Sequence, residues 1–282
     1  MVYDSVGEDS LRAENISRII QGVADMEFKL KQCVMTPRSS SWSESYYREN
    51  STALTPVAGI PRLAAFPHDF VSWEKNTAFM LKHGLETTIS WEDAVSNNMD
   101  VIQRSALRLG SAVAKSVDDA IWAALLAGAG NAVAVDAGQT WNHATRSARI
   151  PHEHIGLAKA KLSDGVTTNF RADKLLLNTT DEIYFTTNDY ILDAFKDGGA
   201  NVLTNGSIGR FLGMDVIVSP AVASDTAMVL QSKMCGTYRM LSPLKVARKL
   251  DEGIGYTIRA WEVGVPFVTT PDAICKITNT NT

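Results

Sequence analysis

The sequence predicts an α+β protein organised around one unusually long helix. Apolar residues recur at spacings of three and four through residues 90–128, which predicts a helix of about ten turns. Short apolar and β-branched runs, bounded by turn-forming residues, fill the second half of the chain and predict strands. A chain of 282 residues can bury one large core or two smaller ones.

The N-terminal region predicts a helix followed by an irregular arm. Apolar residues between positions 9 and 34 recur at helical spacing, with charges at the remaining positions. Residues 36–56 are rich in Ser, Thr and Pro, which predicts irregular chain. This arm also contains Trp42, Tyr46 and Tyr47, and free solvated linkers normally lack such large apolar side chains. We therefore expect the arm to lie on other protein, such as a second subunit.

Residues 57–90 predict a hairpin or meander rather than a core helix. Gly59, Pro61, Pro67 and Gly84 interrupt short extended pieces in this region. The long helix follows, with Ser90 and Asp93 placed as a capping box and Gly128 as the stop signal. At 1.5 Å per residue it would be about 55 Å long, which suits a flat, elongated subunit. Gly110 inside it predicts a bend.

The region after residue 130 mixes helices and strands. A helix is predicted from Pro151 to just before Gly165, and a second, shorter one at residues 186–199 with Thr186 and Asp189 as its cap. Strands are predicted at residues 173–179, 214–219, 227–232, 234–241, 255–264 and 273–278.

The glycine-rich stretch at residues 205–220 raises the question of a phosphate-binding loop. Gly206, Gly209 and Gly213 follow neither of the two known phosphate-loop spacings, and no Lys-Ser or Lys-Thr pair follows them. They also precede a strand, whereas a phosphate loop opens a helix whose N-terminus holds the anion. The stretch therefore predicts a tight turn into a buried strand.

No other motif predicts catalysis, a metal or a cofactor. His152 and His154 are two residues apart at a helix start and do not share a face, and His143 completes no ligand pattern with them. No nucleophile motif is present. The three cysteines are far apart in the sequence, which predicts buried thiols in a reducing compartment.

Charge and hydropathy exclude further classes of protein. The net charge of −4 excludes a strongly basic nucleic-acid binder. No apolar run approaches the roughly 20 residues of a membrane span, and the N-terminus lacks the pattern of a signal peptide. We expect a soluble protein with no membrane partner, made in a cytoplasm.

Four short motifs, in this order along the chain, resemble a known family. Ile89-Ser90-Trp91-Glu92 leads a strand into the long helix, and the helix ends in the small-residue loop of residues 126–130. A turn and strand follow at residues 206–219, and a Pro-x-Ala-Ile motif at residues 271–274. This arrangement resembles the major capsid proteins of tailed bacteriophages and related archaeal viruses, which have the Hong Kong 97-type fold. The resemblance covers most of the chain from about residue 53 onward.

The resemblance implies a domain organisation. It assigns residues 1–52 to an N-terminal helix and arm, and residues 53–90 to an extended loop that reaches over a neighbouring subunit. Residues 91–129 and 241–282 would form a peripheral domain with the spine helix, and residues 130–240 an axial domain. Subunit contacts are expected at Trp42, Tyr46, Tyr47, Trp73, Glu74, Lys75 and Lys82.

The resemblance also implies a function without catalysis or a cofactor. The protein would be a structural component of the virion that self-assembles, as hexamers and pentamers, into an icosahedral shell around double-stranded DNA. The partners it implies are portal, scaffold and decoration proteins, and the packaged DNA through non-specific contacts. Two alternatives stay open at this point: an encapsulin-type nanocompartment shell, and an α+β enzyme whose active site is assembled from dispersed residues.

Overall fold

The computed structural model describes residues 13–50, 57–68, 70–96, 99–163, 170–196, 209–251 and 253–281. These residues fall into two compact units. Unit 1 contains the described residues of Met1–Glu44, Ala78–Ile121 and Tyr238–Pro266. Unit 2 contains those of Ser45–Thr77, Trp122–Thr237 and Phe267–Thr282.

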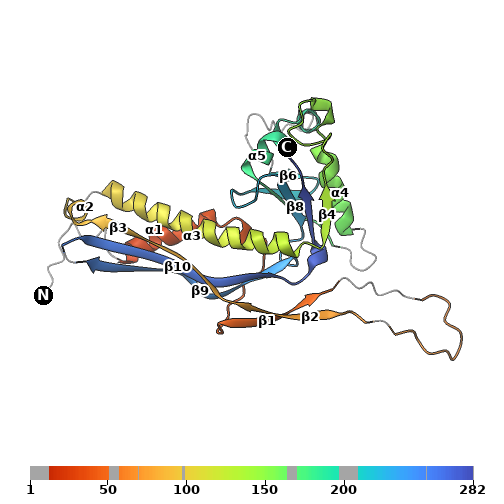
Figure 1. The fold of residues 1–282 in the computed structure, drawn as a ribbon, viewed down its shortest axis with the longest axis horizontal. Coiled ribbons are helices and arrows are strands. Elements are labelled where there is room, and N and C mark those ends of the chain that lie inside the picture. The colour runs from red at the N-terminus through yellow and green to blue at the C-terminus, as the bar shows by residue number, and fades with distance from the viewer. Residues whose placement is uncertain are drawn as a thin grey trace. The chain divides into compact units, whose positions relative to one another are not determined.

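Unit 1 is built on a three-stranded sheet with helices along one side (Figure 1). The strands are β3 (Leu81–Ser90), β10 (Gly255–Val268) and β9 (Gly236–Asp251), in the order β3-β10-β9. β10 pairs antiparallel with β3, from Gly255 opposite Ser90 to Gly264 opposite Leu81. α1 (Ala13–Glu27) and α3 (Met99–Gly128) lie along this sheet. Buried side chains of these elements include Ile16 and Ile20 of α1, Leu109 and Val113 of α3, and Ile258 of β10.

The predicted long helix is two helices. α2 (Trp91–Val95) is followed by a turn at Ser96, and α3 begins at Met99. Serine side chains hydrogen-bond to nearby backbone and so favour helix ends, as Ser96 does by donating to the carbonyl oxygen of Asp93 at 3.3 Å. The predicted cap is confirmed, because Ser90 Oγ accepts the Asp93 N–H at 3.1 Å. α3 ends at Gly128 as predicted, and its 30 residues correspond to about 45 Å.

Gly110 has a packing role within α3. The helix is continuous through this residue. A Cβ at Gly110 would lie 3.0 Å from the carbonyl oxygen of Ile20 in α1. The glycine therefore allows the backbones of α1 and α3 to approach closely. The sequence pattern of α3 alone could not predict this role, because it depends on a residue of α1.

The arm at residues 36–56 is not wholly irregular, contrary to the prediction. β1 (Ser43–Glu49) pairs with β2 (Trp73–Phe79) in a two-stranded sheet. Exposed and half-buried side chains alternate along most of β1, which is the period of a strand with one covered face. The many Ser and Glu residues hide this alternation in the sequence. The residues before β1 pair with β9 through backbone hydrogen bonds, including Tyr238 N–H to the Met35 carbonyl at 2.7 Å.

Unit 2 contains a mixed sheet of six strands, in the order β4-β11-β8-β5-β7-β6. β11 lies parallel to β4 and antiparallel to β8, and α4 (Pro151–Ser163) packs against β11 and β4. The predicted helix at Pro151 is confirmed. The predicted strands are also confirmed, with shifts at their ends: in this sheet they are β5 (Lys174–Leu177), β7 (Met214–Val218), β8 (Thr226–Leu230) and β11 (Ile274–Thr278), and the other two lie within β9 and β10. β4 (Asn131–Ala134) and β6 (Arg210–Phe211) were not predicted.

Two short helices follow β5, where the sequence predicted one. α5 (Thr179–Thr186) precedes α6 (Asp189–Lys196). The predicted cap is wrong, because Thr186 is the last residue of α5. Asn188 caps α6 instead, with its Oδ1 accepting the Tyr190 N–H at 3.1 Å.

The glycine-rich stretch forms a turn before a strand, as predicted. β6 and β7 pair antiparallel and are joined by Leu212 and Gly213, at φ angles of 48° and 81°. Two consecutive positive φ angles are typical of a tight hairpin turn, where glycine is favoured. A Cβ at Gly213 would meet only Lys159 Nζ at 3.9 Å, so the positive φ angle explains the glycine, and close packing does not. Gly206 lies outside the described residues.

The compact units divide the chain at different positions from the predicted domains. Residues 267–282 belong to unit 2, because β11 completes the six-stranded sheet. The sequence prediction grouped them with the long helix. The assignment of a peripheral and an axial domain stays a prediction.

Candidate subunit interface

The connection between β1 and β2 presents a long extended segment. Its ends are held together by the pairing of the two strands and by Asn50 N–H, which donates to the Ser72 carbonyl at 3.1 Å. The described part of the connection, residues 57–68 and 70–72, contains no helix or strand. One tight turn occurs there, with Ala64 N–H donating to the Pro61 carbonyl at 3.1 Å. We call β1, β2 and their connection the hairpin.

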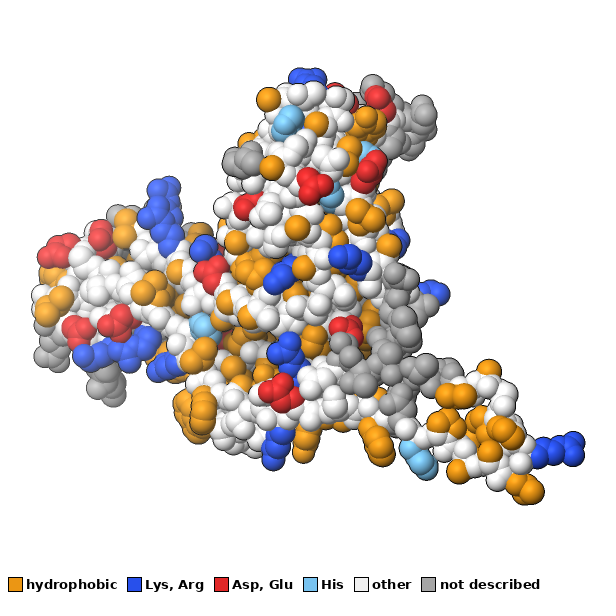
Figure 2. All heavy atoms as spheres, turned by 45° about the vertical axis from the view of Figure 1, so that its right-hand side comes forward, with side chains coloured by type: hydrophobic (Ala, Val, Ile, Leu, Met, Phe, Trp, Pro, Cys, Tyr) orange, Lys and Arg blue, Asp and Glu red, His pale blue; other side chains and the backbone are white. Residues whose placement is uncertain are grey.

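Large apolar side chains of the hairpin face solvent. The exposed fraction is 107% for Leu63, 74% for Phe66 and 57% for Trp73. Figure 2 shows hydrophobic side chains gathered over this connection, at the lower right of the view. Contiguous exposed apolar patches on soluble proteins mark interaction sites. The hairpin therefore has the surface expected of a contact with another protein chain.

Six of the seven predicted contact residues lie on the hairpin or directly before it. Five of them are exposed: Trp42, Tyr47, Trp73, Glu74 and Lys75. Tyr46 is half-buried, and its ring stacks on that of Phe267 at a centroid distance of 4.1 Å. Within the chain, Tyr46 thus packs β1 against Phe267 at the end of β10. The sequence analysis did not identify Leu63 and Phe66, although a run of apolar residues between two prolines is a signal that could have found them.

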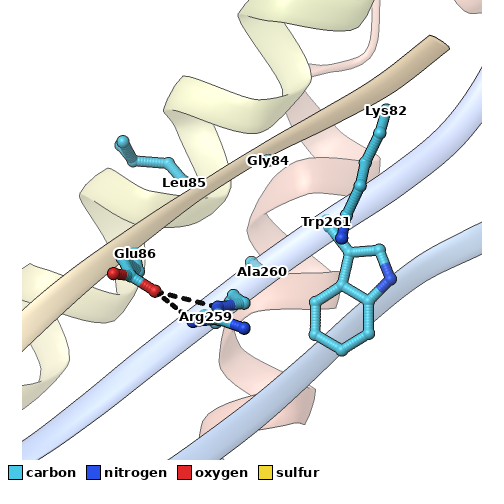
Figure 3. Close-up of a pocket in the computed structure, with 7 residues that line it drawn as sticks. All are labelled: Lys82, Gly84, Leu85, Glu86, Arg259, Ala260 and Trp261. Carbon is cyan, nitrogen blue, oxygen red and sulfur yellow. Dashed lines mark hydrogen bonds and ion pairs between the residues drawn. The ribbon is translucent and has the colours of Figure 1, made fainter.

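The seventh predicted residue, Lys82, lies in a groove on the β3–β10 pair (Figure 3). The groove has a volume of about 370 Å³ and is lined by residues 82, 84–86 and 259–261. Lys82 Nζ lies 5.4 Å from the centroid of the Trp261 ring, a cation–π arrangement. Arg259 donates to Glu86 Oε2 through Nε at 2.8 Å and Nη2 at 2.6 Å. The groove thus contains the Trp261 ring beside the Lys82 cation, and an Arg259–Glu86 ion pair further along the two strands.

Strand register explains why the groove is open at its centre. Gly84 lies opposite Trp261 in the β3–β10 pair. A Cβ at Gly84 would lie 2.8 Å from Trp261 Cβ, so any larger residue would displace the indole. The sequence analysis treated Gly84 as a turn signal, but it lies within β3. Pairing between strands far apart in sequence cannot be found from local pattern, so the groove was missed.

A buried carboxylate fixes the residues that follow α1. Asp118 of α3 is 2% exposed and accepts the backbone N–H groups of Lys29, Leu30 and Lys31 at 2.9, 3.2 and 3.3 Å. These bonds cap the 3₁₀ turn at Leu30–Gln32 from another element. Burial raises the pKa of Asp118, while the three N–H groups and the Lys31 charge oppose this shift.

A buried ion pair joins the same turn to the sheet. Lys31 Nζ lies 2.7 Å from Glu262 Oε1, and the Glu262 side chain is fully buried. Lys31 Nζ is also 4.1 Å from the centroid of the Phe28 ring. Burial and the nearby Glu262 charge raise the pKa of Tyr238. α3 and β10 therefore both hold residues 29–31, which precede the arm in the sequence.

The histidines and cysteines form no metal centre among the described residues. His154 is buried, and this burial lowers its pKa. The rings of His152 and Tyr190 lie 5.0 Å apart by centroid. Cys33, Cys235 and Cys275 are buried thiols outside any disulfide, as predicted. None of the described helices is both long and apolar enough to cross a membrane.

Solved structures with this arrangement of elements are capsids and related particles. The virus-like particle from Pyrococcus furiosus matches with a TM-score of 0.66 and 11% identity, over 94% of this chain and 98% of that one. The capsid of cyanophage P-SCSP1u matches with a TM-score of 0.65 and 14% identity, over 89% and 88%. The structure of phage G gp27 major capsid proteins and gp26 decoration proteins matches with a TM-score of 0.64 and 7% identity, over 90% of both chains. At these identities the likeness is one of fold.

The fold and the exposed hairpin define a capsid protein of the Hong Kong 97 type. The chain belongs to the phage capsid protein family, whose model matches residues 74–277. It is a major capsid protein, a structural and non-enzymatic component of the viral shell. None of the curated proteins matches this sequence.

Proposed function

We propose that this capsid protein assembles, as hexamers and pentamers, into an icosahedral shell that encloses a double-stranded DNA genome. The observation that carries the proposal is the family match over residues 74–277, on a chain whose hairpin exposes large apolar side chains. Such side chains are stabilised by burial against another protein surface. A second copy of the same chain is the partner that a shell supplies.

The hairpin and the groove are proposed as two separate contact surfaces between copies. The hairpin would lie on a neighbouring subunit, with Leu63, Phe66 and Trp73 as its apolar anchors. The groove would present the Trp261 ring and Lys82 to a second copy. Two different surfaces on one chain support head-to-tail association, which closes into rings when the rotation between copies permits. This geometry fits hexamers and pentamers.

The two compact units suggest a refined domain assignment. We propose that unit 1, with the spine helix and the three-stranded sheet, forms most of the peripheral domain. We propose that residues 130–240 form the axial domain together with β11, whose hydrogen bonds lie in the six-stranded sheet.

The remaining partners follow from the same proposal. A net charge of −4 suits weak, non-specific contact with packaged DNA, because strong binding to DNA requires many cationic contacts to phosphate. Portal and scaffold proteins, and assembly in the host cytoplasm, are proposed by family resemblance alone. A decoration protein is proposed because the phage G structure pairs major capsid proteins with decoration proteins.

Nuclease protection tests the enclosed genome. Particles containing this protein, isolated from cells that produce them, are expected to protect double-stranded DNA of uniform length from DNase. The same DNA should become digestible once the shell is disrupted by denaturant. Particles that contain only a protein cargo would contradict the proposal and indicate a nanocompartment.

A further inference from the structure

The last residues of the chain are held by a buried side chain of α5. Asp181, which is fully buried, accepts at Oδ1 the hydroxyl of Thr280 at 3.0 Å and the side-chain N–H of Asn281. Asp225 Oδ1 accepts the backbone N–H of Asn281 at 2.8 Å. These bonds position the segment that follows β11, whose Thr280 carbonyl accepts the Trp141 N–H at 2.7 Å.

Two buried oxygen atoms in this cluster lack a hydrogen-bond donor among the described residues. They are Asp181 Oδ2 and Asn281 Oδ1, on side chains that already share one hydrogen bond. An ionised Asp181 would leave both as unsatisfied acceptors. A buried acceptor that lacks a donor destabilises the folded state, and the penalty is larger when the group is charged. A single proton on Asp181 Oδ2, donated to Asn281 Oδ1, would satisfy both atoms at once.

We propose that Asp181 is a neutral carboxylic acid in the folded protein and forms a cyclic acid–amide pair with Asn281. In this pair the Asp181 O–H donates to Asn281 Oδ1, and the Asn281 side-chain N–H donates to Asp181 Oδ1. The pair is a proton-dependent latch on the C-terminal segment. Its opening would also loosen residues 135–141, because Val135 and Trp141 donate their N–H groups to the carbonyls of Thr278 and Thr280.

The charges around Asp181 favour its neutral form. Burial raises the pKa of Asp181, and the Asp225 charge raises it further, while the bonds from Asn281 and Thr280 oppose the shift. A carboxyl group whose pKa is raised on folding stabilises the fold below its unfolded pKa, about 3.9. That stabilisation is lost as the pH rises through the folded pKa.

The substitution Asp181→Asn distinguishes a neutral acid from a carboxylate. The new side-chain N–H can donate to Asn281 Oδ1, and the remaining oxygen can accept the bonds from Asn281 and Thr280. The variant should therefore keep the latch closed at every pH. In wild type, protection of the C-terminal segment from hydrogen exchange should fall about tenfold per pH unit from about pH 3.9 up to the folded pKa of Asp181 and then level off, after correction for intrinsic exchange rates. In Asp181→Asn this fall should disappear.

Two further variants make the experiment decisive. Asp225→Asn removes the neighbouring charge but keeps an oxygen for the Asn281 backbone, so it should lower the folded pKa of Asp181 and end the fall in protection at a lower pH without abolishing it. Asn281→Ala should lower protection at acidic pH, where the wild-type latch is closed, and should flatten the pH profile. An Asp181→Asn protein that is less protected than wild type at alkaline pH, or that keeps the wild-type pH profile, would overturn the latch. Neither result bears on shell formation.

Discussion

Replacing Lys31 with methionine is expected to lower the free energy of unfolding by about 3 kcal/mol, the lower end of the range for breaking a buried ion pair. Glu262 is fully buried and would lose its cationic partner. The lower end is expected because the Lys31 side chain is 17% exposed, which leaves water some access to the site. Urea denaturation of unassembled subunits, followed by circular dichroism, measures the change.

Two further variants show whether the loss of stability comes from breaking the buried ion pair or from removing any lysine. Lys115→Met removes the partner of Asp119 in an exposed pair, 56% and 46% accessible, and should change stability by less than about 1 kcal/mol. The double variant Lys31→Met, Glu262→Leu should recover much of the loss, because apolar replacement of both partners is often neutral. A Lys31→Met protein as stable as the Lys115→Met control would contradict the account of this cluster.

Replacing Leu63, Phe66 and Trp73 together with serine is expected to abolish particle formation while leaving the subunit folded. All three side chains are more than half exposed, so their removal costs the isolated chain little packing. In a shell, each would lose its burial against a neighbour, worth about 1.5–3 kcal/mol per large apolar side chain. Repetition of this loss at every subunit contact should shift the protein from particles to small species.

The control for the hairpin variant removes exposed apolar side chains elsewhere in the chain. Leu157→Ser and Ile183→Ser remove side chains that are each 56% exposed on helices of unit 2. Sedimentation velocity gives the fraction of protein in particles, and circular dichroism confirms that each variant is folded. Unchanged particle yield in the hairpin variant would show that the hairpin is not an essential contact.

The elements that the sequence predicted well are those defined by local pattern. Helical spacing predicted α1, α3 and α4, and short apolar runs predicted most strands of the six-stranded sheet. The Ser90 cap and the helix end at Gly128 also depend only on neighbouring residues. The resemblance of short ordered motifs predicted the capsid fold, which the family match and the similar structures confirm.

The features that the sequence did not predict depend on contacts between distant residues. Lys31 and Glu262 are 231 positions apart, and a charged residue in a strand ordinarily points to solvent. The groove depends on the register that places Gly84 opposite Trp261. The sequence analysis chose candidate contact residues such as Trp42, Tyr46 and Tyr47 because they are aromatic, whereas exposure in the fold adds Leu63 and Phe66 as candidates. Tyr46 was predicted as a subunit contact, but within this chain its ring stacks on that of Phe267.

Electron microscopy of the purified full-length chain tests the central claim most directly. A major capsid protein should form closed particles of uniform size, or discrete rings of five and six subunits that close into shells when the missing assembly partners are added. Subtomogram or single-particle averages should show the hairpin of each subunit lying on a neighbour. A chain that stays a monomer or dimer under all assembly conditions, including those with its partners present, would contradict the account.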